Sequence, residues 1–165
     1  MSDDKKDVIR EVVVRVCELI KNDDRGQMAR IKRCVNMDYD FSVMPETFGW
    51  MYDTWAGSVI DLCVPYMVYH KIQDEGRGFA DAWKEYRRRC GVSNEEPINK
   101  KFNRLLKCDS KEEFKSEFGG MVRRLKQEKI GFDWYWFMKD VSYWMSGKDE
   151  DKKVVKRWVK DYYCK

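Results

Sequence analysis

The chain has 165 residues and a formal net charge of +4, with 43% hydrophobic and 38% charged residues and a mean hydropathy of -0.75. This length suits one compact folded domain, and the apolar fraction suffices for a core, so the composition excludes a disordered chain. A run of about 18 apolar residues is missing, and the polar start Met1–Lys6 lacks the apolar segment of a signal peptide, so we expect a cytoplasmic protein without membrane contact.

The positive charge is concentrated in the second half of the sequence. Residues 1–90 hold 15 Lys and Arg against 16 Asp and Glu, whereas residues 91–165 hold 18 against 13. A basic excess of this kind favours a surface that faces a polyanion. Five excess charges are also common on surfaces that have no such partner.

The first two helices are predicted from apolar residues at helical spacing. Val8, Val12 and Leu19 belong to a stripe that predicts a helix over about residues 5–21. A second stripe, which includes Met28 and Ile31, predicts a short helix whose opposite side is basic.

The middle of the chain is less regular. Residues 36–57 lack a sustained period and contain Pro45 and two glycines, so we expect a long irregular connection. A third helix is predicted from about Ser58, with Pro65 inside it. A fourth follows Gly78 and ends in three consecutive arginines, residues 87–89, which suit the negative end of a helix.

Helix starts are better marked in the second half. Ser93-x-x-Glu96, followed by a proline, and Ser110-x-x-Glu113 both resemble capping boxes. Asp133 is suited to cap the next helix of this half, and a last helix is predicted after Gly147. We therefore predict an all-α fold, a compact bundle of about eight helices. It forms either one helical domain over residues 1–165 or two closely packed helical subdomains, an N-terminal part over 1–92 and a basic C-terminal part over 93–165, with a seam near residues 91–96.

Residues for catalysis are scarce. His70 is the single histidine, the six cysteines show no C-x-x-C pair, and no phosphate-binding glycine motif occurs. Asp133 and Asp140 lie seven residues apart and could contribute to a Mg²⁺ site. Asp133 is equally explained as a helix cap, and Asp140 as an ion-pair partner of Lys139 or Lys148. We predict reduced thiols, no enzyme activity, no metal and no cofactor.

Basic residues at helical spacing are the most distinctive feature of the second half. They are Lys100, Arg104 and Lys107, then Arg123 and Arg124, and finally Lys153, Lys156, Arg157 and Lys160. Such stripes can follow a phosphate backbone, although an amphipathic helix also carries Lys and Arg simply on its solvated face. Several tryptophans accompany them and could stack on bases; Trp136 is the least core-like of these.

The order of the motifs resembles the CasB family, the small subunits of CRISPR type I-E Cascade. Residues 26–33, GQMARIKR, are similar to the A-x-[IL]-[KR]-R segment near the start of that family. The family's C-terminal order is matched by INKKFNRLL (98–106), MVRRL (121–125), FDW (132–134), VSYW (141–144) and KRWVKDYY (156–163). Residues 36–90 match poorly: Asp53-Thr54-Trp55 stands where some relatives carry a basic residue.

The resemblance implies a helical, non-catalytic subunit present in two copies along the effector complex. Its partners would be the backbone and large Cascade subunits, the guide RNA and the target and displaced DNA strands, with a role in antiviral defence. Basic motif positions are matched by Lys32, Arg33, Lys101, Arg104, Arg123 and Arg124, and the predicted nucleic-acid-binding set is completed by Arg30, Lys100, Lys107, Lys156 and Arg157. Two other functions fit the residues: a helical protein adaptor without nucleic-acid contact, and a carboxylate-metal nuclease.

Overall fold

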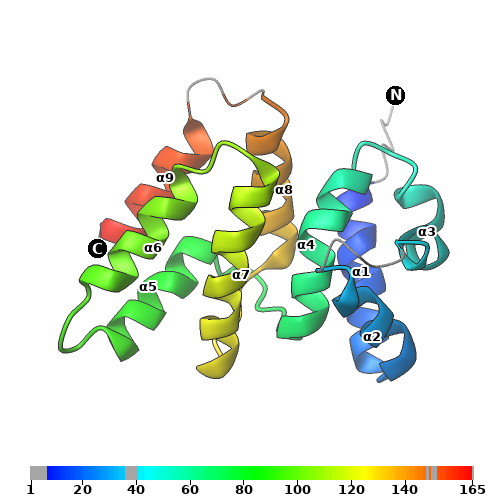
Figure 1. Cartoon of the computed structure of the whole chain (residues 1–165), viewed down its shortest axis with the longest axis horizontal. Coiled ribbons are helices and arrows are strands. Elements are labelled where there is room, and N and C mark those ends of the chain that lie inside the picture. The colour runs from blue at the N-terminus through cyan, green and yellow to red at the C-terminus, as the bar shows by residue number, and fades with distance from the viewer. Residues whose placement is uncertain (1–6, 36–40, 148, 150–151, 165) are drawn as a thin grey trace. The chain divides into compact units, whose positions relative to one another are not determined.

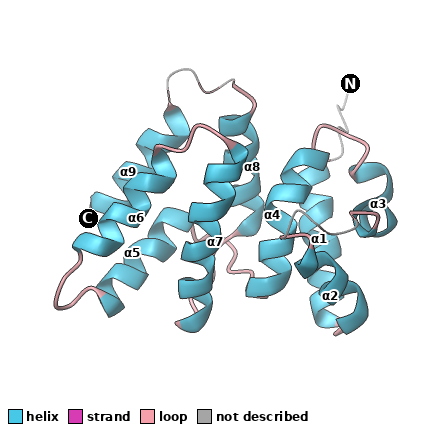
Figure 2. Ribbon diagram, viewed as in Figure 1, coloured by secondary structure: helices cyan, strands magenta, loops and turns pink. Residues whose placement is uncertain are grey.

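The computed structural model describes residues 7–35, 41–147, 149 and 152–164. Figure 2 shows helices joined by loops, and the described residues form nine α-helices and one 3-10 helix. The all-α prediction is confirmed. The chain divides into two compact units, Met1–Lys71 and Ile72–Lys165, each of which is considered by itself. Within the described ranges, no helix is long and apolar enough to cross a membrane.

The N-terminal unit is organised around its longest apolar helix (Figure 1). Its elements are α1 (Val8–Lys21), α2 (Arg25–Arg33), α3 (Val43–Phe48), the 3-10 helix η1 (Gly49–Met51) and α4 (Gly57–His70). Helix α4 packs against both α1 and α2. It runs without interruption past the buried Pro65, and its last residue, His70, is 1% exposed. His70 is therefore a buried residue of the helix end.

The connection predicted to be irregular contains a helix. Helix α3 buries Val43, Met44 and Phe48, and η1 follows it directly. Six residues are too few for a helical period to stand out in the sequence, and this helix lacks a side-chain cap at its start. Packing of α3 against α2 stabilises it in place of local signals. Residues 36–40 of the predicted connection lie outside the described residues.

The C-terminal unit consists of five helices, with α5 packed against three of the others. They are α5 (Phe79–Cys90), α6 (Glu96–Leu106), α7 (Lys111–Gln127), α8 (Trp134–Met145) and α9 (Lys153–Tyr163). Helix α5 packs against α6, α7 and α9. Its first residue, Phe79, contacts the rings of Phe118, Phe137 and Trp158 at centroid distances of 5.6, 5.2 and 5.4 Å. Aromatic burial of this extent dominates the stability of the unit.

The boundary between the units differs from the seam expected near residues 91–96. The loop at that position joins α5 to α6 inside the C-terminal unit, and the division falls after Lys71. The sequence placed the seam at Gly91 because a helix ends there. Tertiary packing assigns α5 to the C-terminal unit, since α5 lies against helices that follow it in the chain.

The helix starts of the second half follow their sequence signals in two of three cases. The Ser110 side chain accepts from Glu113 N at 3.1 Å, and that of Asp133 accepts from Tyr135 N at 3.0 Å, as predicted. Ser93 does not cap α6. Instead, Asn94 Oδ1 accepts from Glu96 N at 3.1 Å, because an Asn side chain readily bonds the backbone two residues on.

Asp133 also fixes the loop that precedes α5. Its carboxylate accepts from Gln73 Nε2 at 2.8 Å and from Gly76 N at 2.9 Å, and Gln73 Oε1 accepts from Trp134 N at 2.8 Å. The side chain of Asp133 is 5% exposed, so these donors satisfy a carboxylate that would otherwise be costly to bury. The loop over residues 73–78 is thereby held against the start of α8.

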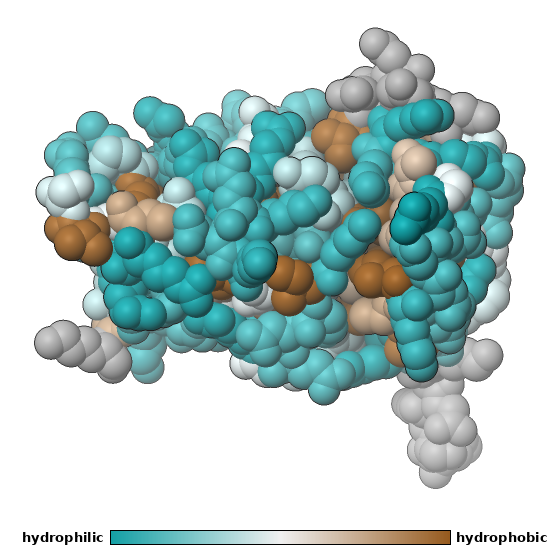
Figure 3. All heavy atoms as spheres, turned by 90° about the horizontal axis from the view of Figure 1, so that it is seen from below, coloured by the Kyte–Doolittle hydropathy of each residue, from teal (hydrophilic) through white to brown (hydrophobic). Residues whose placement is uncertain are grey.

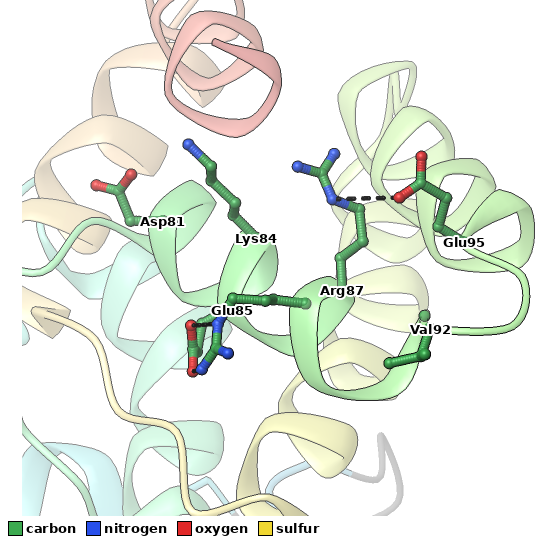
Figure 4. A pocket seen from close by; sticks show the side chains of 8 residues that line it. Asp81, Lys84, Glu85, Arg87, Val92 and Glu95 are labelled. Atoms are coloured by element: carbon green, nitrogen blue, oxygen red, sulfur yellow. Dashed lines mark hydrogen bonds and ion pairs between the residues drawn. The ribbon is translucent and has the colours of Figure 1, made fainter. Parts of the chain in front are cut away.

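The C-terminal half of α5 binds the ends of two other helices. Lys84 Nζ donates to Cys164 O at 2.7 Å and Arg87 Nη2 to Tyr162 O at 3.2 Å; Figure 4 shows both side chains pointing toward the end of α9. Arg89 Nη1 donates to Glu128 O, just after α7, at 2.8 Å. Cations at these positions satisfy carbonyl groups that lack a partner within their own helix.

Candidate nucleic-acid interface

Helix α2 carries the predicted basic residues of the N-terminal unit on its last turn. Met28 and Ile31 are buried, which directs Arg30 and Arg33 outward and leaves Lys32 half-buried. Arg30 Nη1 pairs with Glu46 Oε2 of α3 at 2.7 Å. Lys32 and Arg33 have no carboxylate partner among the described residues. Arg30 therefore contributes to the packing of α2 and α3, and Lys32 and Arg33 keep their charge available.

Helix α6 presents four of the predicted residues. Its buried side is formed by Ile98, Phe102 and Leu105, and Lys100, Arg104 and Lys107 are exposed, with Lys101 half-buried. Lys100 Nζ lies 3.1 Å from Glu96 Oε1, one helical turn earlier. The other three cations pair with no carboxylate of the described chain.

On helix α7 the two adjacent arginines differ. Successive residues of a helix point about 100° apart, and here Arg123 is exposed whereas Arg124 is half-buried. Arg124 lies close to Tyr86 of α5: burial raises the pKa of the Tyr86 hydroxyl, and the neighbouring Arg124 charge partly offsets that rise. Arg123 has no described carboxylate partner. The sequence treated this pair as equivalent, and the structure separates them.

On helix α9, Lys156 is exposed, and Arg157 is held in an ion pair. Arg157 Nη2 forms an ion pair with Asp140 Oδ1 of α8, and Trp158 Nε1 donates to Asp140 Oδ2 at 3.0 Å. The expected partner of Asp140, Lys139, instead donates to the Tyr135 hydroxyl at 3.2 Å. That expectation was wrong for Lys139, because a partner seventeen residues away on another helix is reached only in the folded unit. Lys148 lies outside the described residues.

The structure brings some of the predicted residues together. Helices α6 and α7 pack against each other, so Lys101, Arg104, Lys107 and Arg123 belong to one helical pair of the C-terminal unit. Lys32 and Arg33 belong to the N-terminal unit.

Hydrophilic residues predominate on the face shown in Figure 3, and hydrophobic ones occupy separate patches. Trp136 is 53% exposed, in line with the sequence, whereas Trp134 and Trp158 are buried. Sequence reasoning missed two further exposed tryptophans, Trp50 and Trp55. The absence of any Lys or Arg between residues 34 and 70 could have indicated that this region differs from the basic half.

The two carboxylates considered for a Mg²⁺ site are used elsewhere. Asp133 accepts from Gln73, Gly76 and Tyr135, and Asp140 from Arg157 and Trp158. Within the described part of the chain, no group of three or more His, Cys, Asp or Glu side chains is arranged to hold a metal ion. Asp133 therefore serves as a helix cap and loop anchor, and Asp140 serves as the partner of Arg157 and Trp158.

Comparison with known proteins finds a matching family model and a similar solved structure. The family model described as CRISPR-associated protein Cse2 matches residues 27–163. The crystal structure of CasB from Thermobifida fusca is similar with a TM-score of 0.76 and 14% sequence identity, over 95% of this chain and 98% of that one. Among curated proteins, none matches the sequence. The likeness to CasB therefore concerns the fold, and the family model covers most of the chain.

Proposed function

Because the chain belongs to the CRISPR-associated Cse2 family, the CasB small subunits of type I-E Cascade, we propose that it acts there as a non-catalytic subunit that binds nucleic acid without sequence preference. Its cations hold the guide RNA–target DNA duplex and the displaced strand by their phosphates. Its partners are the backbone and large subunits and a second copy of itself.

The observation that carries this proposal is the availability of the cations on α6 and α7. Lys101, Arg104 and Lys107, together with Arg123, face no carboxylate among the described residues, although the two helices pack together. A cation that is not paired within the protein releases counterions from DNA without first breaking an ion pair. Contacts of this kind position a protein on the backbone and carry no base information.

A charge-removal experiment tests the proposal. The triple variant Lys101→Gln, Arg104→Gln, Arg123→Gln is compared with the original chain for binding to a fluorescent single-stranded DNA by anisotropy. We expect about tenfold weaker binding or more at low salt, and a log-log salt slope shallower by about 0.7 for each lost contact. The loss should be similar for DNAs of different sequence.

A control variant of equal charge accompanies it. Lys21, Lys111 and Lys129 are exposed lysines outside the predicted set and outside the basic stripes, so their replacement by Gln removes the same three charges from other places. We expect this control to retain most of the affinity and the slope. Equal losses in both variants would show that only net charge matters, and a sequence-specific, salt-insensitive footprint would refute backbone binding.

A further inference from the structure

A groove in the C-terminal unit has a charge opposite to that of the proposed nucleic-acid surface. Its volume is about 280 Å³, and it lies between the start of α5, the middle of α8 and the second half of α9. Phe79, Phe137 and Trp158 form part of the lining, and the rings of Phe137 and Trp158 lie 5.9 Å apart. Trp136 lines the groove as well and is 53% exposed.

Carboxylates outnumber cations in this groove. Asp81, Asp140, Asp161 and Arg157 are its charged lining residues, three negative and one positive, which gives a net charge of -2. Asp140 forms an ion pair with Arg157 and accepts a hydrogen bond from the Trp158 indole. Asp81 and Asp161 form no ion pair within the described chain. The Asp161 pKa is raised, by burial first and then by repulsion from Asp81, so the carboxylates are close enough to disfavour each other's charge.

The groove is built on fixed elements. Gly76, on its edge, donates its backbone N–H to Asp133, which is itself held by Gln73. Phe79 and Phe137 are 2% and 1% exposed and form a packed base. A site with such a base loses little conformational entropy when a side chain enters it.

We propose that this groove receives an arginine side chain from a partner protein, with the guanidinium against the Trp136 indole and within reach of Asp81 and Asp161. Charge complementarity identifies the occupant. A guanidinium stacks on an aromatic face and donates in a planar fork that matches carboxylates. A phosphate would meet the carboxylates of Asp81 and Asp161, and the one cation of the lining, Arg157, already pairs with Asp140. The groove therefore suits a cationic protein side chain rather than the phosphates that the α6–α7 cations would bind.

A titration of the full chain tests the inference without any DNA. The probe is the peptide acetyl-Gly-Arg-Gly-amide, and its control replaces arginine with citrulline, which has nearly the same shape and no charge. The indole N–H signal of Trp136 is identified by its loss in Trp136→Phe and is followed by NMR. We expect a saturable shift with the arginine peptide only. Asp161→Asn should weaken binding by about tenfold, and Asp109→Asn, an exposed carboxylate elsewhere in the unit, should not change it.

Two results would overturn the inference: equal shifts with the citrulline peptide, or unchanged affinity in Asp161→Asn. A second measurement uses the assembled Cascade complex with a photo-reactive phenylalanine at position 136. An adduct with an arginine-bearing protein segment, on another subunit or on a second copy, supports the inference. An adduct with nucleic acid alone, or none from an assembled complex, refutes it. Since the peptide titration involves no nucleic acid, its failure and that of the proposed DNA binding are distinguishable.

Discussion

The C-terminal turn of α5 and the outer faces of α6 and α7 are both basic, but the structure uses their cations differently. Arg87, Arg88 and Arg89 are the longest uninterrupted basic run in the sequence. All three are bound within the protein: Arg88 and Arg89 pair with Glu85, and Arg87 lies 4.3 Å from the Tyr162 ring centroid. Arg104 and Arg123 belong to no such run and have no carboxylate partner among the described residues.

The difference shows that the density of charge in a sequence does not measure its availability to a ligand. Arg87 and Arg89 donate to carbonyl groups at the ends of α9 and α7. A phosphate could bind them only by displacing bonds that stabilise the fold. Cations on the solvent side of α6 and α7 face no such competition. Substitutions in α5 should therefore change the stability of the fold, and substitutions on α6 and α7 should change the affinity for DNA.

The largest effect on stability is expected from Arg87→Ala. This side chain is 18% exposed, contacts the Tyr162 ring, donates to Tyr162 O and pairs with Glu95. Loss of a cation–π contact and of a charged hydrogen bond should lower the free energy of unfolding by about 2 kcal/mol, or roughly 4–8 °C in Tm. Thermal unfolding measures it, and DNA affinity should stay unchanged.

Arg88→Ala is the matched control for that prediction. Its side chain is 71% exposed and pairs only with Glu85 of its own helix, so we expect a change below about 0.5 kcal/mol. If both variants unfold at the same temperature, the α5 run is not structural. A loss of salt-dependent DNA binding in Arg87→Ala would place this run in the nucleic-acid surface instead.

A smaller effect should separate the neighbours Arg123 and Arg124. Arg124→Gln removes a half-buried cation that lies beside Tyr86 and should cost about 1 kcal/mol of stability, the usual contribution of one polar contact. Arg123→Gln should leave stability within about 0.5 kcal/mol and reduce the salt slope of DNA binding. Urea unfolding and anisotropy on both variants give the two values. A stability loss in Arg123→Gln together with a reduced salt slope in Arg124→Gln would contradict the roles inferred from the exposure of the two side chains.

Glu85 offers a pH-dependent test of the same α5 cluster. Hydrogen bonds from Arg88 and, to a smaller extent, Arg89 lower the Glu85 pKa from 4.5 to about 2. A lowered carboxylate pKa stabilises the folded state above its ordinary value, and this contribution is lost as pH falls from 4.5 toward 2. Glu85→Gln should therefore lose up to about 1 kcal/mol at neutral pH. Unfolding measured from neutral pH to about pH 3 should show the two chains converging.

Local features of the fold were predictable from the sequence, and contacts between helices were not. Apolar spacing located α1 and α5, and Ser110 and Asp133 marked helix starts, because each signal lies within a few residues. The packing of α3 and the division after Lys71 depend on tertiary contacts. At the candidate site, helical spacing indicated which cations lie outward. It did not indicate which of them meet a carboxylate from another helix, as Arg157 meets Asp140.

The smallest expected change in stability concerns Asp161, whose pKa is shifted in the opposite direction to that of Glu85. Its pKa is raised by burial and then by Asp81, so the charged carboxylate is less favourable in the folded chain than in the unfolded one. Asp161→Asn should therefore gain stability above the raised pKa, by about 0.5 kcal/mol or less, and the gain should vanish as pH falls and Asp161 takes up a proton.

Urea unfolding of Asp161→Asn at neutral and acid pH measures this gain, with Asp140→Asn as the control. Asp140→Asn should lose stability, because it leaves Arg157 without its carboxylate. If Asp161→Asn is the less stable chain at neutral pH, the carboxylate supports the fold and the groove is not poised for a cation. A variant that gains stability and at the same time loses affinity for the arginine peptide would show that Asp161 serves binding at the expense of the fold, as expected of a functional residue.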